Sequence, residues 1–267
     1  MNNFMVYDQK QITNSFWKDE ILIFIDKSDL NNFDEYKGGD PYNVNENLYG
    51  PFQKRRFNLI TKLIKKYSET HDKILDIGCG EGQLTNYIKK ELDSKNVFGC
   101  DYSFSAIKEA KKNNPQIYFC VADALKLPYR KSTFDVILCA NLFEHVESPA
   151  ILVKNCYNIL NNNGLLIIST PSRYRFGNLI RVITGRNIKF MSNHHITEYT
   201  VGQVKEITKK YNFKYLYHTS EIIIPQEIKY NFVFVLLFIP KMIFNIFLRI
   251  VNSHHNLEST VFYVFKK

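Results

Sequence analysis

The sequence predicts an α/β fold: a doubly wound, mostly parallel sheet of seven strands with helices on both faces. Three observations support this. From residue 52 onward, short apolar runs alternate with stretches of helical periodicity. The connections between these segments are short. Three of the apolar runs end at or beside an aspartate, where ligands of such sheets bind. A chain of 267 residues is long enough for one large domain with a real core.

The core begins with a helix predicted over residues 52–67, where apolar residues recur at close to helical spacing. The seven strands share short runs of β-branched and aromatic residues, and are predicted at 73–77, 96–100, 116–122, 134–140, 164–170, 213–224 and 259–265. Helices are predicted between them at 82–92, 103–113, 148–160 and 201–211. Ser103 is a candidate N-cap, and Pro149 is typical of a first helical turn.

Composition shifts divide the chain further. Residues 1–51 are rich in Asn, Asp and Gly and are expected to form an N-terminal arm or a lid. The catalytic core is expected at 52–226, with a basic insertion at 172–197. Residues 227–258 form a predicted apolar helical insertion, and 259–267 return to the core as its last strand.

The formal net charge is +9 at pH 7. Such a charge favours anionic partners, which include a phosphorylated substrate, nucleic acid and an acidic membrane surface. A basic, Lys- and Asn-rich proteome would explain it equally well. The first ten residues lack a secretory pattern, and the five cysteines contain no CxxC pair. We therefore expect reduced thiols and a cytoplasmic location, which includes the inner face of the membrane.

The segment "ILDIGCGEG" at 74–82 joins a predicted strand to a helix. Gly78, Gly80 and Gly82 follow a G-x-G-x-G spacing, which differs from the G-x-G-x-x-G of dinucleotide sites. Asp76 and Glu81 would repel a pyrophosphate and suit a cationic ligand. The alternative is a tight turn without a ligand.

Two further acids follow the next two predicted strands. Asp101 can accept hydrogen bonds from both hydroxyls of a ribose, as in other nucleoside-binding α/β folds. Asp123 can accept one from an exocyclic adenine amine. Together the acids and glycines describe a nucleoside without phosphates and with a positively charged tail.

At this point the chain resembles the class I S-adenosylmethionine-dependent methyltransferases. The motifs "ILDIGCGEG", "VFGCDYS", "VADALKLPYRKSTFDVILCANLFEHV" and "LNNNGLLIISTP" look like those of the family in order and spacing, over about residues 55–211. The resemblance is strongest to the small-molecule branch that includes ubiquinone-biosynthesis and surface-glycan methyltransferases. It implies a Rossmann-like fold and S-adenosyl-L-methionine as the cofactor.

The resemblance also implies roles for residues at the matching positions. Asp76, Gly78 and Gly80 would hold the methionine part, and Asp101 and Tyr102 the ribose and adenine. The adenine edge and the sulfonium would be lined by four further residues, Asp123, Ala124, Asn141 and Leu142.

A hydroxyl acceptor must lose a proton, and "NLFEHV" places Glu144 and His145 beyond the fourth strand for this work. In the family it resembles, this histidine can instead order the loop under the cofactor. His195, in the pair with His194, is a second candidate base or substrate contact, and a solvent-exposed turn is its alternative. Ubiquinone-type enzymes tend to carry E-x-x-E-H, which can hold a divalent metal. Here Asn141 replaces the first acid, so we expect no metal.

The acceptor is expected to be small or lipid-linked, and anionic. The basic insertion holds five Lys and Arg residues and no acid, although it could also be a solvated surface. The apolar run at 231–251 carries polar residues at Lys241, Asn245 and Arg249, on one helical stripe. Such a helix can lie in a membrane surface, or it can pack on the domain or on a partner subunit.

The sequence leaves two alternatives to a small-molecule methyltransferase. Methylation of nucleic acid would fit the charge, but "CANL" follows the fourth strand where a tetrad that holds a flipped base would be expected. A non-catalytic binding protein of the same fold would be expected to have lost Asp101 or the glycines. The sequence predicts neither the acceptor atom nor the oligomeric state.

Overall fold

The computed structural model describes residues 3–32, 34, 37–38, 46–69, 73–94, 96–220, 243–244, 246–247 and 259–267. Their strands are β1 (Phe16–Lys18), β2 (Ile21–Ile23), β3 (Lys73–Ile77), β4 (Asn96–Asp101), β5 (Tyr118–Val121), β6 (Phe134–Ala140), β7 (Leu160–Pro171), β8 (Lys214–Ser220) and β9 (Thr260–Lys266). Their helices are η1 (Asn3–Val6), α1 (Gln9–Thr13), α2 (Asp29–Asn32), α3 (Glu46–Tyr67), α4 (Gln83–Leu92), α5 (Phe104–Asn113), α6 (Pro149–Ile159), α7 (Phe176–Ile183) and α8 (Val201–Lys210).

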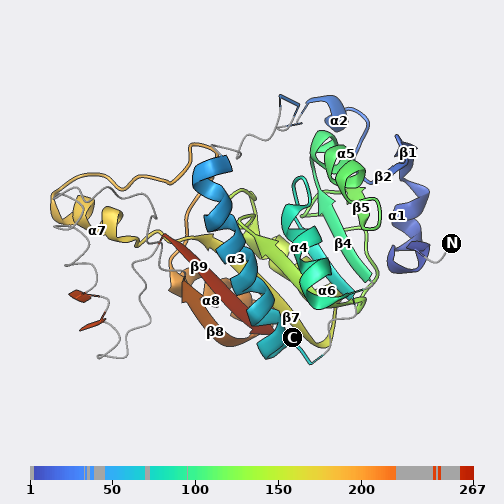
Figure 1. The fold of residues 1–267 in the computed structure, drawn as a ribbon. Coiled ribbons are helices and arrows are strands. Elements are labelled where there is room, and N and C mark those ends of the chain that lie inside the picture. The colour runs from blue at the N-terminus through green and yellow to red at the C-terminus, as the bar shows by residue number, and fades with distance from the viewer. Residues whose placement is uncertain are drawn as a thin grey trace.

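These strands form one sheet in the order β1-β2-β5-β4-β3-β6-β7-β9-β8 (Figure 1). The five central strands are parallel to one another, and β9 runs antiparallel between β7 and β8. The predicted Rossmann-like fold with a mostly parallel sheet is therefore confirmed.

The sheet has nine strands in the described part of the chain, and not the seven predicted. The additional strands, β1 and β2, come from the N-terminal segment. All three residues of β2 are buried, and Leu22 pairs in parallel with Cys120 of β5. The prediction missed them because each strand has only three residues, and a period of two cannot be recognised in so short a run.

Helices cover both faces of the sheet, as predicted. One apolar cluster joins α3 and α4 to one face of β3, β6 and β7, for example through Ile64, Ile88 and Val136. A second cluster joins α6 and α8 to the other face through Val153, Val204 and Ile137. The helix α5 packs with β2 and β5 in a third cluster. This layering leaves the carboxyl ends of the parallel strands at one edge, where the site is built.

Several element boundaries differ from the prediction. The helix α3 begins at Glu46, earlier than the predicted start at residue 52, so it includes the end of the segment predicted as an arm. Ser103 caps α5, because its side chain accepts a hydrogen bond from the Ala106 amide, and Pro149 opens α6 as expected. All five cysteines are free thiols, and all except Cys79 are buried.

Most of the apolar insertion predicted at 227–258 lies outside the described residues. Within it, 243–244 and 246–247 are helical, and Ile243, Phe244, Ile246 and Phe247 are exposed. These four helical residues do not establish that the whole of 227–258 forms a helical insertion. Among the helices that the structure describes, none has the length and apolar character needed to cross a membrane.

Candidate functional site

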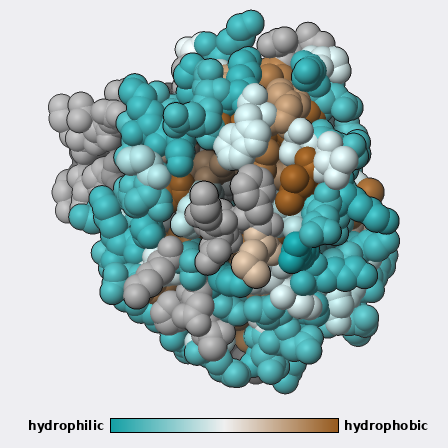
Figure 2. Space-filling model, turned by 90° about the vertical axis from the view of Figure 1, so that its right-hand side faces the viewer, coloured by the Kyte–Doolittle hydropathy of each residue, from teal (hydrophilic) through white to brown (hydrophobic). Residues whose placement is uncertain are grey.

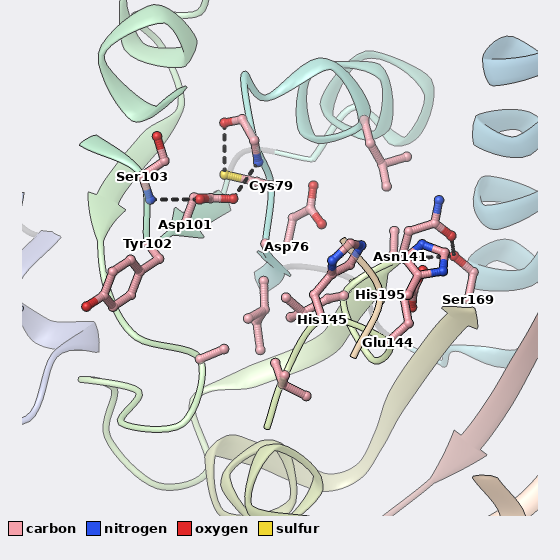
Figure 3. Close-up of a pocket in the computed structure, with 18 of the residues that line it drawn as sticks. Asp76, Cys79, Asp101, Tyr102, Ser103, Asn141, Glu144, His145, Ser169 and His195 are labelled. Atoms are coloured by element: carbon pink, nitrogen blue, oxygen red, sulfur yellow. Dashed lines mark hydrogen bonds between the residues drawn. The ribbon is translucent and has the colours of Figure 1, made fainter. Parts of the chain in front are cut away.

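A pocket of about 930 Å³ opens at the carboxyl ends of β3, β4, β5 and β6. Every residue that the sequence analysis placed in the site lines this pocket (Figure 3). The helix α3 adds Phe57 and Ile60 to the wall, and the segment after β7 adds Met191 and Ile196. One cavity therefore holds the expected cofactor residues and the candidate bases together.

The glycine turn after β3 leaves bare backbone at the pocket. Gly78, Gly80 and Gly82 have φ angles of 71°, 52° and 75°, a region that L-residues with side chains rarely adopt. A Cβ added to Gly78 would lie 2.9 Å from Cδ1 of Leu142. The alternating glycines thus meet two needs, because they allow the left-handed turn and leave room for the loop after β6.

Asp76, near the end of β3, is almost completely buried, at 1% exposure. Its Oδ2 accepts a hydrogen bond from the Thr85 hydroxyl at 2.7 Å, and its Oδ1 has no partner in the described structure. Burial raises the pKa of Asp76 to about 7, although the Thr85 hydrogen bond opposes this shift. A buried carboxylate oxygen without a partner on the pocket wall is suited to a cationic or hydrogen-bonding ligand.

Asp101 ends β4 and fixes the glycine turn. Its Oδ2 accepts from the Gly80 amide at 2.9 Å, and its Oδ1 accepts from the Ser103 amide at 2.9 Å (Figure 3). A carboxylate has about four acceptor positions, so these two bonds orient it without exhausting them. Asp34, from the N-terminal segment, accepts from the Ser103 hydroxyl and ties that segment to the start of α5.

The other expected cofactor residues follow the neighbouring strands. Asp123 accepts from the Leu125 amide at 2.7 Å, which holds its carboxylate after β5, and Ala124 stands beside it on the wall. Burial, followed by the nearby Asp29 of α2, raises the pKa of Tyr102 to about 12, so its hydroxyl stays protonated at neutral pH.

The loop after β6 carries Asn141 in a left-handed conformation, at a φ of 52°. Ser169 of β7 stabilises this conformation, because its carbonyl accepts from the Asn141 amide at 2.9 Å and its hydroxyl donates to the Asn141 side chain at 3.2 Å. Leu142 then lies over Gly78. Sequence reasoning missed Ser169, whose only signal is its place at the end of a predicted strand.

Glu144, His145 and His195 meet in the pocket although the last comes from the insertion. The Glu144 carbonyl accepts from the Ile196 amide at 2.9 Å, which draws the insertion onto the loop after β6. The rings of His145 and His195 lie 4.9 Å apart, edge to face. His194 contributes its carbonyl, which contacts His145 Nδ1 at 3.2 Å, while its side chain is exposed and does not line the pocket.

Sequence reasoning also missed Glu198, which is fully buried and lies 3.1 Å from His195 Nδ1. Burial would raise the pKa of Glu198, but hydrogen bonds from His195, Arg175 and the Met191 amide hold it below its usual value. An ionised carboxylate only accepts, so His195 must carry its proton on Nδ1, and the neutral ring has its acceptor at Nε2. The only sequence signal was the single acid at the end of a basic segment.

Glu144 is 1% exposed, and both of its carboxylate oxygens lack a partner in the described structure. One ligand atom each from Glu144, His145 and His195 lies within 4.8 Å of the others. These three groups could hold a divalent metal, although the sequence analysis expected none. Asn141 stands three residues before Glu144 in the same loop and supplies no acid.

Burial raises the pKa of Glu144 to about 7, and nearby cations only partly offset this. Because this pKa lies above the ordinary value of 4.5, folding favours the protonated form. The resulting stabilisation is complete below about pH 4.5 and is lost as the pH rises through about 7. Glu144→Gln should therefore gain more than about 1 kcal/mol over wild type between about pH 5 and pH 8.

Urea unfolding of both proteins at the two pH values measures this difference. Glu147→Gln changes an exposed carboxyl of the same loop and should follow wild type. Parallel pH dependences for wild type and Glu144→Gln would contradict the raised pKa.

The comparisons with known proteins agree with this geometry. Residues 75–168 match a protein family described as a methyltransferase domain. The mitochondrial ubiquinone biosynthesis O-methyltransferase of Saccharomyces cerevisiae is 30% identical over 154 residues, which are 53% of this chain and 47% of the yeast protein. The ubiquinone biosynthesis O-methyltransferase of Coxiella burnetii is 31% identical over 159 residues, which are 56% of this chain and 64% of that protein. The chain thus spans between about half and two thirds of these relatives.

A solved structure shows the same fold over most of the chain. It is the magnesium protoporphyrin IX methyltransferase of Synechocystis PCC 6803 with bound SAH, with a TM-score of 0.56 and 13% identity. The likeness covers 87% of this chain and 90% of that one, and at this identity it concerns the fold alone. The matched domain, the motifs in their order and the site geometry agree, and residues 75–168 therefore form an S-adenosylmethionine-dependent methyltransferase domain.

Proposed function

We propose that the protein transfers a methyl group from S-adenosyl-L-methionine to a hydroxyl of a small or lipid-linked acceptor. The observation that carries this proposal is that one pocket holds both the acids at the ends of β3, β4 and β5 and the cluster of Glu144, His145 and His195. A donor held by the first group would present its methyl toward the second.

The residues present fit this donor. S-adenosyl-L-methionine, when bound, supplies an activated methyl on a positively charged sulfur. The unpartnered Oδ1 of Asp76 would accept from its amino group, and the bare backbone at Gly78 admits it closely. Asp101 would accept from the ribose hydroxyls, and Asp123 from the adenine amine. Asn141 and Leu142 would line the sulfur.

On the acceptor side, His195 is our proposed general base, with Glu198 as its positioning residue. Glu198 accepts from Nδ1 and thereby turns Nε2 into the basic atom. It also stabilises the imidazolium that forms when a proton is taken up. His145 Nδ1 contacts the backbone carbonyl of His194 at 3.2 Å, and this contact orients the ring.

The reaction balances without another reactant. The acceptor oxygen forms a bond to the methyl carbon as the carbon–sulfur bond breaks, and the electron pair of that bond stays on sulfur. The hydroxyl proton passes to Nε2 of His195 and from there to solvent. The chain aligns the two reactants and limits the access of water, and alignment alone can contribute several kcal/mol.

Two observations support the acceptor class. The relatives from yeast and Coxiella burnetii are named O-methyltransferases, which favours a hydroxyl. The pocket is also lined by the apolar side chains of Phe57, Ile60, Met191 and Ile196, which suit an acceptor with an apolar part.

The proposal is tested by supplying the purified protein with donor that carries a radiolabelled methyl and adding fractionated cell extract. We expect label in the lipid or small-molecule fraction and none with protein omitted. Label in the nucleic-acid fraction would establish the first rival function. Donor binding by calorimetry without transfer to any fraction would favour the binding protein.

A further inference from the structure

The helix α7 in the insertion has an unusual orientation. Its one buried residue is Asn178, at 3% exposure. The Asn178 amide donates to the Arg173 carbonyl at 3.0 Å, and its oxygen accepts from the Lys189 amide at 3.1 Å. A helix normally buries its apolar side, but α7 is anchored to the rest of the insertion through a polar residue.

Four apolar residues lie on the side of the helix opposite Asn178, and two of them, Ile180 and Ile183, are exposed. Phe176, Leu179, Ile180 and Ile183 follow the i, i+3, i+4, i+7 spacing of a single helical stripe. Ile180 is 37% exposed and Ile183 is 71% exposed. An exposed apolar stripe of this kind marks a surface that meets an apolar partner.

The stripe belongs to a larger apolar surface, the insertion face, which we define as the α7 stripe with Val182, Phe190, Met191 and Ile196. All four of these added residues are exposed, at 40–59%. Met191 and Ile196 also line the pocket, so the insertion face runs to its mouth. In Figure 1 the exposed helical fragments 243–244 and 246–247 project at the same end of the molecule as α7.

The positive charge of the insertion indicates which kind of surface the insertion face can meet. Residues 172–197 contain no Asp or Glu and five Lys or Arg. Arg175 is paired with Glu198, which leaves Arg173, Arg181, Arg186 and Lys189 around the insertion face. By contrast, the face on the side of α1 is covered mainly by hydrophilic residues in Figure 2. An apolar stripe bordered by cations complements the acyl chains and headgroups of an anionic bilayer.

We propose that the insertion face docks on an anionic lipid bilayer, with the α7 stripe in the interface and the cations at the headgroups. The mouth of the pocket then opens onto the membrane, where an acceptor with an apolar tail can enter without crossing water. This second part rests on the proposed function, whereas docking itself does not. A lipid-linked acceptor that carries a hydroxyl near its headgroup is the substrate class that this geometry selects.

Co-sedimentation of the full chain with vesicles tests the docking. Vesicles of phosphatidylglycerol and phosphatidylcholine should retain the protein, added salt should weaken retention, and pure phosphatidylcholine should retain little. The variant with Ile180→Glu and Ile183→Glu together should partition at least about tenfold more weakly, because two apolar side chains that the bilayer would bury become charged. Ile151→Glu, at an isoleucine of α6 whose 44% exposure lies between those of Ile180 and Ile183, is the matched control and should bind like wild type.

Three outcomes separate the alternatives. Failure of the wild type to bind anionic vesicles while it stays monomeric in sedimentation equilibrium would overturn docking. A dimer that Ile180→Glu with Ile183→Glu dissociates would overturn it too, and would identify a second copy as the partner. Donor affinity by calorimetry should be the same in that variant and in wild type. If vesicle binding holds but no methyl transfer is found with any fraction, docking stands and the proposed function fails.

Discussion

Replacing His195 with alanine should lower turnover by about 10²-fold or more and leave affinity for the methyl donor nearly unchanged. The reason is that the Glu198 carboxylate accepts from Nδ1 of His195 and leaves Nε2 as the basic atom of the ring. Loss of the ring removes the group that accepts the hydroxyl proton but none of the expected donor contacts. Single-turnover transfer and calorimetry measure the two quantities separately.

Two variants control this result. His194→Ala changes an exposed side chain next in sequence, which does not line the pocket, and should keep wild-type turnover. Glu198→Gln keeps the size of the positioning residue but removes its charge, so turnover should fall by roughly tenfold while donor affinity stays the same. Thermal unfolding of Glu198→Gln is needed as well, because the charge also pairs with Arg175.

One pair of results would assign the role of general base to His145 in place of His195. If His145→Ala loses turnover with donor affinity intact while His195→Ala retains turnover, then His145 is the base. If either variant loses donor affinity and turnover to the same extent, that histidine orders the loop instead. A metal at Glu144, His145 and His195 would show as loss of transfer on chelation and recovery on adding a divalent cation.

Replacing Asp101 with alanine should lower donor affinity by roughly tenfold or more. Hydrogen bonds to a charged acceptor are worth ~1.5–3 kcal/mol each, and two are expected from the ribose. The structure adds a second cause, since Asp101 also accepts from the amides of Gly80 and Ser103 and so fixes the glycine turn. Isothermal calorimetry with S-adenosyl-L-methionine measures the change.

The control for Asp101→Ala is Glu109→Ala, which removes an acid from the adjacent α5 where it pairs with exposed Lys112. It should bind donor like wild type. Equal donor affinity in Asp101→Ala and wild type would contradict the placement of the ribose at the end of β4, and with it the orientation of the donor in the pocket.

Much of the donor end of the pocket could be predicted from the sequence because its determinants are local. Each expected acid stands at or beside the end of an apolar run, and parallel strands bring such ends to one edge whatever the details of packing. A glycine turn between a strand and a helix was similarly expected, and the structure gives Gly78, Gly80 and Gly82 left-handed angles there. Ser103 and Pro149 marked the helix starts for the same local reason.

The acceptor end and the surface were decided by tertiary structure. His195 reaches Glu144 only because the insertion folds back and its Ile196 amide donates to the Glu144 carbonyl, a contact that no spacing encodes. The β2 strand joins β5 across nearly a hundred residues, and a three-residue run carries too little pattern to predict that pairing. Likewise, periodicity shows that α7 has an apolar stripe, but only the burial of Asn178 decides that the stripe faces outward. Local patterns determine which segments become strands, helices and turns, whereas non-local hydrogen bonds and packing determine which side chains meet.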